Sequence, residues 1–114
     1  MLAITTYFNP FKDPLRLNNY KLFTKSLNCP LLTVEWSLDG KFELSSDHAS
    51  ILVQVQGGGS LLWQKEALLN LALKYIPRGV EYIAWIDCDV LFEDSDWIAE
   101  AISALKKIPG HSVI

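Results

Sequence analysis

The feature that most constrains this chain is an apolar run that ends in two aspartates. Segment 82–97 reads YIAWIDCDVLFEDSDW, so the apolar run 82–86 is followed at once by Asp87 and Asp89, with Cys88 between them. A short β-prone run of this kind, bounded by charge, predicts a buried strand. Two carboxylates at the end of such a strand are costly to desolvate unless a positive group meets them. A divalent metal that holds a phosphate group is one such partner.

Composition narrows the classes of protein that the chain can belong to. It has 114 residues, half of them hydrophobic and a fifth charged, which predicts one folded domain spanning 1–114. A formal net charge of -3 without a basic cluster argues against a nucleic-acid partner. Cys29 and Cys88 lie at no metal-ligand spacing and indicate reduced thiols. With no basic leader at the N-terminus and no run as long as a membrane span, we expect a cytoplasmic protein without a transmembrane segment.

Strand-like and helix-like patterns alternate along the chain. Strands are expected at 2–8, 31–36, 51–55 and 80–86, and helices at 15–27, 61–76 and after a cap at Asp94 or Ser95. A short edge strand is expected around Phe42 and Leu44, and the opening of another strand at 111–114. Short links between strands and helices favour a parallel sheet with right-handed crossovers. The predicted fold class is therefore α/β, with a mainly parallel, Rossmann-like sheet and flanking helices.

Polar or turn residues stand where each of the four expected strands ends. In open parallel sheets, ligands bind outside the carboxyl ends of the strands. The four ends are 5–9 (TTYFN), 35–36 (EW), 56–59 (QGGG) and 87–89 (DCD). The carboxylate oxygens of the 87–89 end are hard ligands that suit Mn²⁺ or Mg²⁺. Substrate phosphates often complete the coordination of these ions. The convergence of four such ends is more informative than any one of them.

Several of these features have a second interpretation. The glycines at 57–59 match neither the phosphate loop of ATPases nor the GxGxxG of dehydrogenases, and they either approach a ligand or form a flexible turn. Glu35 either accepts a ribose hydroxyl or caps a loop. Lys65 either reaches a phosphate or forms a solvated pair with its neighbour. Asn70 lies either on the wet side of its helix or in a buried hydrogen bond.

Four segments together resemble the nucleotide-binding half of a GT-A-type glycosyltransferase. They are the strands ITTYFNP, LLTVEW and AWIDCDVLF and the helix WQKEALLNLAL. The third strand looks like the Asp-x-Asp motif of that family with its apolar lead-in. The resemblance implies a domain that binds a nucleotide-diphosphate sugar through Mn²⁺ or Mg²⁺, for transfer of the sugar to an unknown acceptor.

The resemblance also implies roles for individual residues. Asp89 would be the direct metal ligand, and Asp87 would lie nearer the ribose or the outer coordination sphere of the metal. The remaining residues of the nucleotide-sugar site would be Thr5, Thr6, Tyr7 and Glu35 around the base and ribose, with Lys65 and Asn70 on the helix that faces the nucleotide.

Members of this family continue well past their Asp-x-Asp motif into an acceptor site and, in inverting enzymes, a catalytic base. We therefore expect this chain to be the N-terminal part of a longer GT-A domain or a truncated relative, with its catalytic base unassigned. Two other classes stay open. One is a non-catalytic α/β binding module in which Asp87 and Asp89 are turn residues. The other is a different metal-dependent phosphoryl-transfer enzyme that uses the same acidic strand end.

Overall fold

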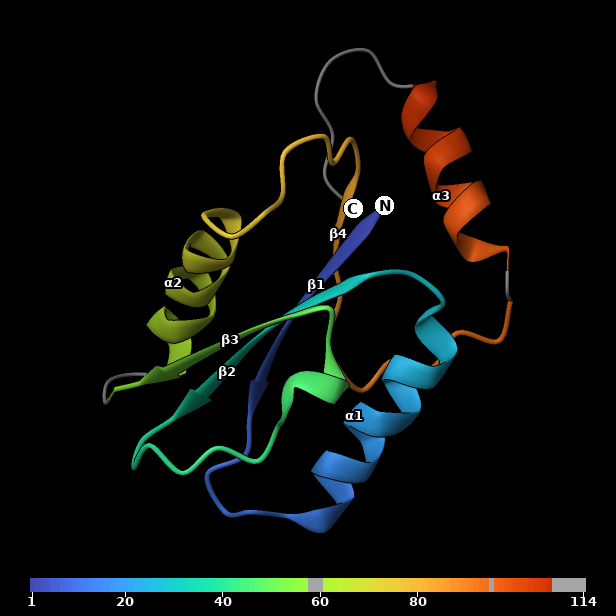
Figure 1. Ribbon diagram of the computed structural model, residues 1–114. Helices are drawn as coiled ribbons and strands as arrows, with labels where there is room; N and C mark the ends of the chain where they lie inside the picture. Colours follow the sequence, from blue (N-terminus) through green and yellow to red (C-terminus); the bar gives the residue numbers. More distant parts are fainter. Residues whose placement is uncertain (58–60, 95, 108–114) are drawn as a thin grey trace.

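Strands and helices alternate along the chain in the computed structural model, which describes residues 1–57, 61–94 and 96–107, with the side chains of 61–65 outside the description. Figure 1 shows their arrangement. The strands are β1 (Leu2–Phe8), β2 (Leu31–Ser37), β3 (Ile51–Gln56) and β4 (Ile83–Trp85). The helices are α1 (Pro14–Leu27), α2 (Leu61–Leu73) and α3 (Trp97–Lys106), with a 3₁₀ turn η1 (Ser46–His48) before β3.

The four strands of the described chain form one sheet, in the order β3-β2-β1-β4, and every neighbouring pair is parallel. This confirms the predicted α/β class with a parallel sheet. The strand order reverses at β1, because β2 and β3 are added on one side of it and β4 on the other. Such a reversal is the usual place for a ligand crevice in open α/β sheets.

Alternate residues of the central strands enter two separate apolar layers. One layer lies against α2 and contains Leu2, Ile4, Leu32, Val34, Trp36, Leu68 and Ala72. The other lies on the α1 side and contains Ala3, Tyr7, Tyr20, Phe23, Leu27, Leu31 and Leu44. All seven residues of β2 are buried, because strands flank it on both edges and helices cover both faces of the sheet. Figure 1 shows α1 and α2 on opposite sides of the sheet.

Helix α1 begins and ends at residues suited to those positions. The Asp13 side chain accepts a hydrogen bond from the Leu15 amide (3.0 Å), and Pro14 occupies the first helical position. Asn28 ends the helix in the left-handed conformation, with φ of 59°. The helix thus starts and stops close to the predicted range 15–27.

Tyr20 joins α1 to the sheet and to η1. Its hydroxyl donates to the His48 carbonyl (2.9 Å) and lies 2.8 Å from Thr33 Oγ1. Because the single phenol hydrogen goes to His48, the Thr33 hydroxyl is the donor of the second bond. One buried side chain therefore connects three elements of the fold.

The segment after β4 folds back against the carboxyl end of α1. The Phe92 amide donates to Ser26 Oγ (3.2 Å), and Trp97 Nε1 donates to the Leu27 carbonyl (3.0 Å). The rings of Phe92 and Trp97 stack with centroids 4.3 Å apart. This packing places α3 on the same side of the sheet as α1.

The expected edge strand around Phe42 and Leu44 is wrong. The segment between β2 and η1 has no strand, although Leu44 is buried. The physical reason is that the amides of Glu43 and Leu44 donate to the Glu35 carboxylate instead of to a neighbouring strand.

Other element boundaries also differ from the prediction. Helix α2 ends at Leu73 rather than at residue 76, and β4 has three residues, because it pairs only with the first half of β1. The cap of α3 is Asp96 rather than Asp94, and the Asp96 amide donates to Oδ1 of Asp94, two residues earlier (2.8 Å). The alternative cap at Ser95 and the expected strand opening at 111–114 lie outside the described residues.

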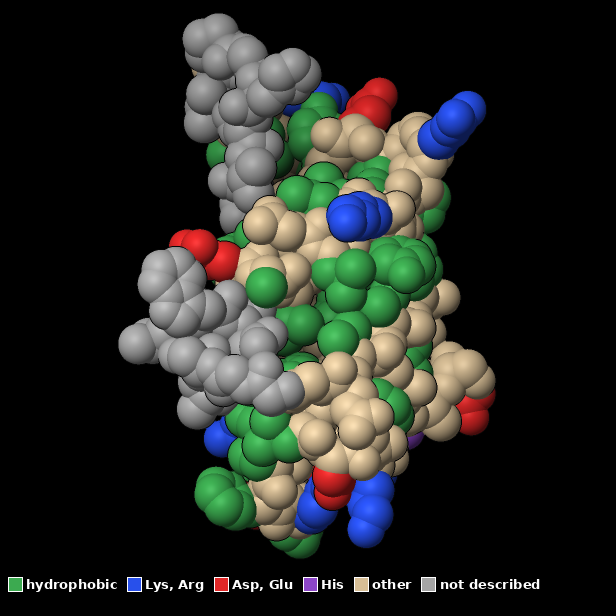
Figure 2. Space-filling model, turned by 90° about the vertical axis from the view of Figure 1, so that its left-hand side faces the viewer, with side chains coloured by type: hydrophobic (Ala, Val, Ile, Leu, Met, Phe, Trp, Pro, Cys, Tyr) green, Lys and Arg blue, Asp and Glu red, His purple; other side chains and the backbone are tan. Residues whose placement is uncertain are grey.

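The face that α2 covers carries a group of hydrophobic side chains in its middle (Figure 2). Leu73 and Tyr75, at the end of α2 and just after it, are each about half exposed.

Among the described helices, none has the length and apolar character that crossing a bilayer requires.

Candidate functional site

The carboxyl ends of the four strands lie at one edge of the sheet, because all four strands are parallel (Figure 1). The expected convergence of the four strand ends is confirmed for the described residues, while Gly58 and Gly59 lie outside them. Open parallel sheets bind their ligands at this edge.

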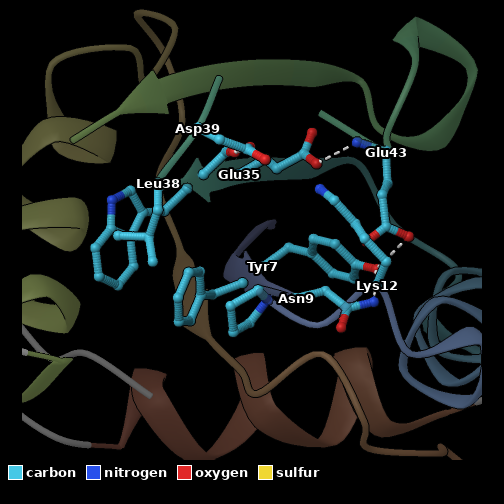
Figure 3. A pocket seen from close by; sticks show the side chains of 11 residues that line it. Tyr7, Asn9, Lys12, Glu35, Leu38, Asp39 and Glu43 are labelled. Carbon is cyan, nitrogen blue, oxygen red and sulfur yellow. Dashed lines mark hydrogen bonds between the residues drawn. The ribbon is translucent and has the colours of Figure 1, made fainter. Parts of the chain in front are cut away.

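A pocket opens at this edge, between the ends of β1 and β2 and the loops that follow them (Figure 3). Its volume is about 200 Å³. Ligand pockets usually measure roughly 300–1,000 Å³, so this one can admit a part of a nucleotide sugar but not the whole molecule. Its lining includes Tyr7, Asn9, Lys12, Glu35, Asp39 and Glu43 as polar groups and Phe8 and Trp36 as aromatic rings.

One wall of the pocket is a hydrogen-bonded chain that starts at Asn9. The Asn9 amide group donates to the Asp13 carbonyl (2.9 Å) and to the Tyr7 hydroxyl (3.3 Å), and its oxygen accepts from the Asp13 amide (3.0 Å). The Tyr7 hydroxyl in turn donates to Glu43 Oε2 (3.4 Å). Asn9 and Tyr7 are almost fully buried, so the wall is held in place from behind.

Glu35 ties the loop after β2 to the sheet. The residue is only 2% exposed. Its Oε2 accepts from the Glu43 amide (2.7 Å), and its Oε1 accepts from the Leu44 amide (3.2 Å) and from Gln54 Nε2 (3.0 Å). These are the contacts of a loop cap. The ribose contact implied by the family resemblance stays a prediction.

Of the three site residues predicted on β1, one lines the pocket. Tyr7 lines it, whereas Thr5 and Thr6 do not. Thr5 is fully buried inside the sheet, and its Oγ1 has no hydrogen-bond partner among the described residues. Thr6 is half-buried one residue further along β1.

The aspartate turn lies beside β1. Strand pairing of β4 ends at Trp85, opposite Ile4, and the Ile86 amide donates to the Ile4 carbonyl (2.9 Å). The Val90 amide then donates to the Asp87 carbonyl (3.3 Å) and closes a turn in which Asp87 and Asp89 are both exposed. Ile4 lies three residues before Tyr7, so the pairing stops about 10 Å short of the pocket along the sheet.

The two aspartates are the candidate metal ligands. Among the described residues, no group of three or more His, Cys, Asp or Glu side chains is arranged to hold an ion. Two exposed carboxylates match a Mn²⁺ or Mg²⁺ ion that takes its remaining ligands from phosphate and water. They do not form an enclosed, all-protein site.

Cys88 lies between the aspartates and packs against the α1-side layer. Burial, and then the neighbouring Asp89 carboxylate, raises the pKa of the Cys88 thiol, while the Arg16 guanidinium opposes the shift. A thiol in this state is a poor nucleophile at neutral pH. The geometry therefore gives Cys88 a packing role.

Two cations at this edge were missed by the sequence reasoning. Lys12 lines the pocket; its Nζ donates to the Lys41 carbonyl (2.6 Å), and its backbone has a left-handed φ of 51°. Arg16, an exposed residue of α1, donates from Nη1 to the Phe8 carbonyl (2.8 Å) at the end of β1. A signal was available for Lys12, because the segment NPFKD directly follows the first strand.

The loop after β2 supplies two further pocket residues that were not foreseen, Asp39 and Glu43. Asp39 Oδ1 accepts from the Lys41 amide (2.9 Å) and the Ser37 hydroxyl (2.8 Å), and these two bonds hold the pKa of its carboxyl below the ordinary value. The polar segment SLDGKFE after the second strand was visible in the sequence. The sequence did not show that this segment folds back over the end of β2.

Helix α2 contributes less to the described site. Asn70 is exposed, so of its two interpretations the wet side of the helix is correct. Lys65 lies in the second turn of α2, and its side chain falls outside the described residues. The phosphate role of Lys65 therefore stays a prediction.

Alkaline pH should destabilise the fold through Tyr7 and Tyr20. Burial raises the pKa of each phenol to about 12, from about 10 in an unfolded chain. Since the folded pKa is the higher one, their stabilising contribution is complete below about pH 10 and is lost as pH rises toward 12. Phenolate absorbance, followed together with circular dichroism, should show these two residues ionising late and with loss of structure. Tyr75→Phe, which removes a half-exposed phenol, is the control. Complete ionisation of Tyr7 and Tyr20 near pH 10 with the fold intact would contradict the expectation.

No family model matches the chain, and neither a curated protein nor a solved structure matches it. The fold, the pocket and the aspartate turn are therefore the basis for assigning a function.

Proposed function

We propose that the chain is the nucleotide-sugar-binding part of a metal-dependent, GT-A-type glycosyltransferase. One observation carries the proposal. The turn that contains Asp87 and Asp89 follows β4 beside β1, at the point where the strand order reverses. Crevices at such reversals are where open parallel sheets bind their ligands, and two exposed carboxylates there suit a divalent ion with a diphosphate.

In this proposal the pocket and the aspartate turn bind different parts of the nucleotide-sugar donor. The base lies in the pocket next to Tyr7, with the ribose near Glu35 at its edge, because the pocket is too small for the complete donor. The diphosphate extends outside the carboxyl ends of the strands, from the pocket toward the aspartate turn. In this arrangement Asp89 binds the metal, and Asp87 lies in the outer coordination sphere of the metal.

Charge balance supports this division. When bound, the metal neutralises the negative charge that develops on the leaving nucleoside diphosphate. Arg16 adds a fixed positive charge at the end of β1, close enough to the turn to lower the pKa of the Cys88 thiol. Lys65 of α2 is the second candidate for a phosphate contact.

Calorimetric titration with UDP-sugars and GDP-sugars, with and without Mn²⁺, tests the proposal. We expect Mn²⁺ to strengthen binding of one donor by about 10-fold or more, equivalent to roughly 1.4 kcal/mol. Asp89→Ala should abolish that gain, because it removes the direct metal ligand. Asp47→Ala, which removes an exposed carboxylate from η1, should leave it unchanged.

Three results would count against the glycosyltransferase function. Binding that does not depend on Mn²⁺ would remove the metal from the mechanism, as would binding that is unaltered in Asp89→Ala. Metal-dependent binding of nucleoside diphosphates with no preference for the attached sugar would favour the phosphoryl-transfer alternative. Failure of every nucleotide to bind would favour a non-catalytic module.

A further inference from the structure

The pocket at the ends of β1 and β2 presents more hydrogen-bond acceptors than donors (Figure 3). Three carboxylates line it, from Glu35, Asp39 and Glu43, against the single ammonium of Lys12. A phosphate group would meet net negative charge there. A neutral ligand with N–H donors would meet acceptors instead, so the lining favours a base over a phosphate.

Glu43 has the largest unused capacity among these acceptors. Both oxygens of Glu35 accept protein hydrogen bonds, and Asp39 Oδ1 accepts two. By contrast, Glu43 Oε2 has one long contact, 3.4 Å from the Tyr7 hydroxyl, and its buried Oε1 has no partner among the described residues. A buried acceptor without a donor is unfavourable. A small rotation of this weakly held carboxylate toward the pocket lets a ligand supply the missing donor.

Lys12 supplies a donor in the same pocket. Its ammonium carries three hydrogens, and the Lys41 carbonyl accepts one of them. Figure 3 shows the Lys12 side chain reaching into the space between Tyr7 and Glu35, with Glu43 alongside. The left-handed backbone of Lys12 is a costly conformation for a lysine, and such conformations are enriched at binding sites.

Aromatic rings supply flat surfaces beside these polar groups. Phe8 and Trp36 stack with centroids 4.1 Å apart, and both line the pocket, as does Tyr7 from the other face of the sheet. A nucleobase stacks favourably on such rings. The pocket is therefore suited to a flat, donor-rich ring.

We propose that this pocket selects guanine, so that the donor is a guanosine-diphosphate sugar; the inference rests on the proposed function. Guanine presents a carbonyl oxygen next to two N–H donors, from N1 and from the 2-amino group. The carbonyl accepts from Lys12, and the two donors reach the Glu43 carboxylate. Uracil places a second carbonyl where guanine has its 2-amino group, and that carbonyl faces the carboxylate. Adenine has its donor and acceptor in the reverse order.

Calorimetric titration of the chain with GDP, IDP and UDP in the presence of Mn²⁺ tests the inference. IDP lacks only the 2-amino group, so it should bind roughly 10- to 100-fold more weakly than GDP through loss of one hydrogen bond to a carboxylate. UDP should also bind more weakly than GDP. Glu43→Gln should reduce the preference for GDP over IDP to a few-fold, whereas Glu81→Gln, at an exposed glutamate away from the pocket, should preserve it.

The possible outcomes separate this inference from the proposed function. Equal affinity for UDP and GDP, or for IDP and GDP, overturns guanine selection and leaves a metal-dependent nucleotide site standing. An unchanged preference in a folded Glu43→Gln variant overturns the role of that carboxylate. If circular dichroism shows this variant unfolded, the ranking of the three nucleotides by the natural chain decides. Absence of binding by all three overturns both proposals.

Discussion

Replacing Glu35 with alanine should lower the free energy of unfolding by about 2 kcal/mol or more, because the buried Leu44 amide and the part-buried Glu43 amide lose their acceptor. The amides of Glu43 and Leu44 and the side chain of Gln54 all donate to this carboxylate. Leaving a buried donor unpaired costs about 1–3 kcal/mol each, against a total stability of about 5–15 kcal/mol for a domain of this kind. Urea unfolding followed by circular dichroism measures the loss.

Two further variants separate this effect from the general cost of a substitution. Glu35→Gln keeps one acceptor oxygen and the side-chain volume, so its loss of stability should be intermediate. Glu66→Ala removes an exposed glutamate from α2 and should change stability by less than about 0.5 kcal/mol. If Glu35→Ala proved as stable as Glu66→Ala, the loop-cap role of Glu35 would be wrong.

Replacing Trp36 with alanine should cost about 3–5 kcal/mol, the range for truncation of a large buried aromatic residue. Trp36 is 3% exposed, belongs to the α2-side layer and stacks on Phe8. Its Nε1 also donates to the Gly57 carbonyl (2.7 Å), which ties the end of β2 to the chain that leaves β3. The variant therefore removes packing, a ring stack and a hydrogen bond together.

The variant Trp36→Phe separates the contribution of the ring packing from that of the hydrogen bond. It keeps an aromatic ring for the stack on Phe8 but removes the donor to Gly57, so we expect a loss of about 1–2 kcal/mol from the bond and from the smaller ring. Thermal and urea unfolding of both variants give the comparison. Equal losses in the alanine and phenylalanine variants would assign the whole effect to the hydrogen bond and contradict the packing argument.

The order of strands and helices followed from local patterns. Leu2–Phe8 and Leu31–Ser37 are short β-prone runs between turn residues, and each forms the expected strand. Helix α1 begins at Pro14, after the Asp13 cap, and ends before the Asn28 cap, because these residues favour helix ends whatever the surrounding fold. Since a helix with short links joins β1 to β2 and another joins β3 to β4, the parallel sheet could be predicted as well.

Predictions failed where a distant partner determines the local structure. The segment around Phe42 has the alternation of an edge strand, but its amides bond to the Glu35 carboxylate. The strand expected at 80–86 has seven residues, yet β4 has three and ends at the pairing of Trp85 with Ile4. Both outcomes depend on what lies alongside, which a local pattern does not encode.

The candidate site divides in the same way. The sequence alone determined the two aspartates after an apolar strand, Tyr7 at the end of the first strand and the α/β class that brings these ends together. Only the tertiary structure decided that Glu35 caps a loop and that Lys12, Asp39 and Glu43 enclose a pocket around Tyr7. The reason is physical. Hydrophobic periodicity and helix ends act over a few residues, whereas a buried carboxylate takes whichever donors the folded chain brings within hydrogen-bonding distance.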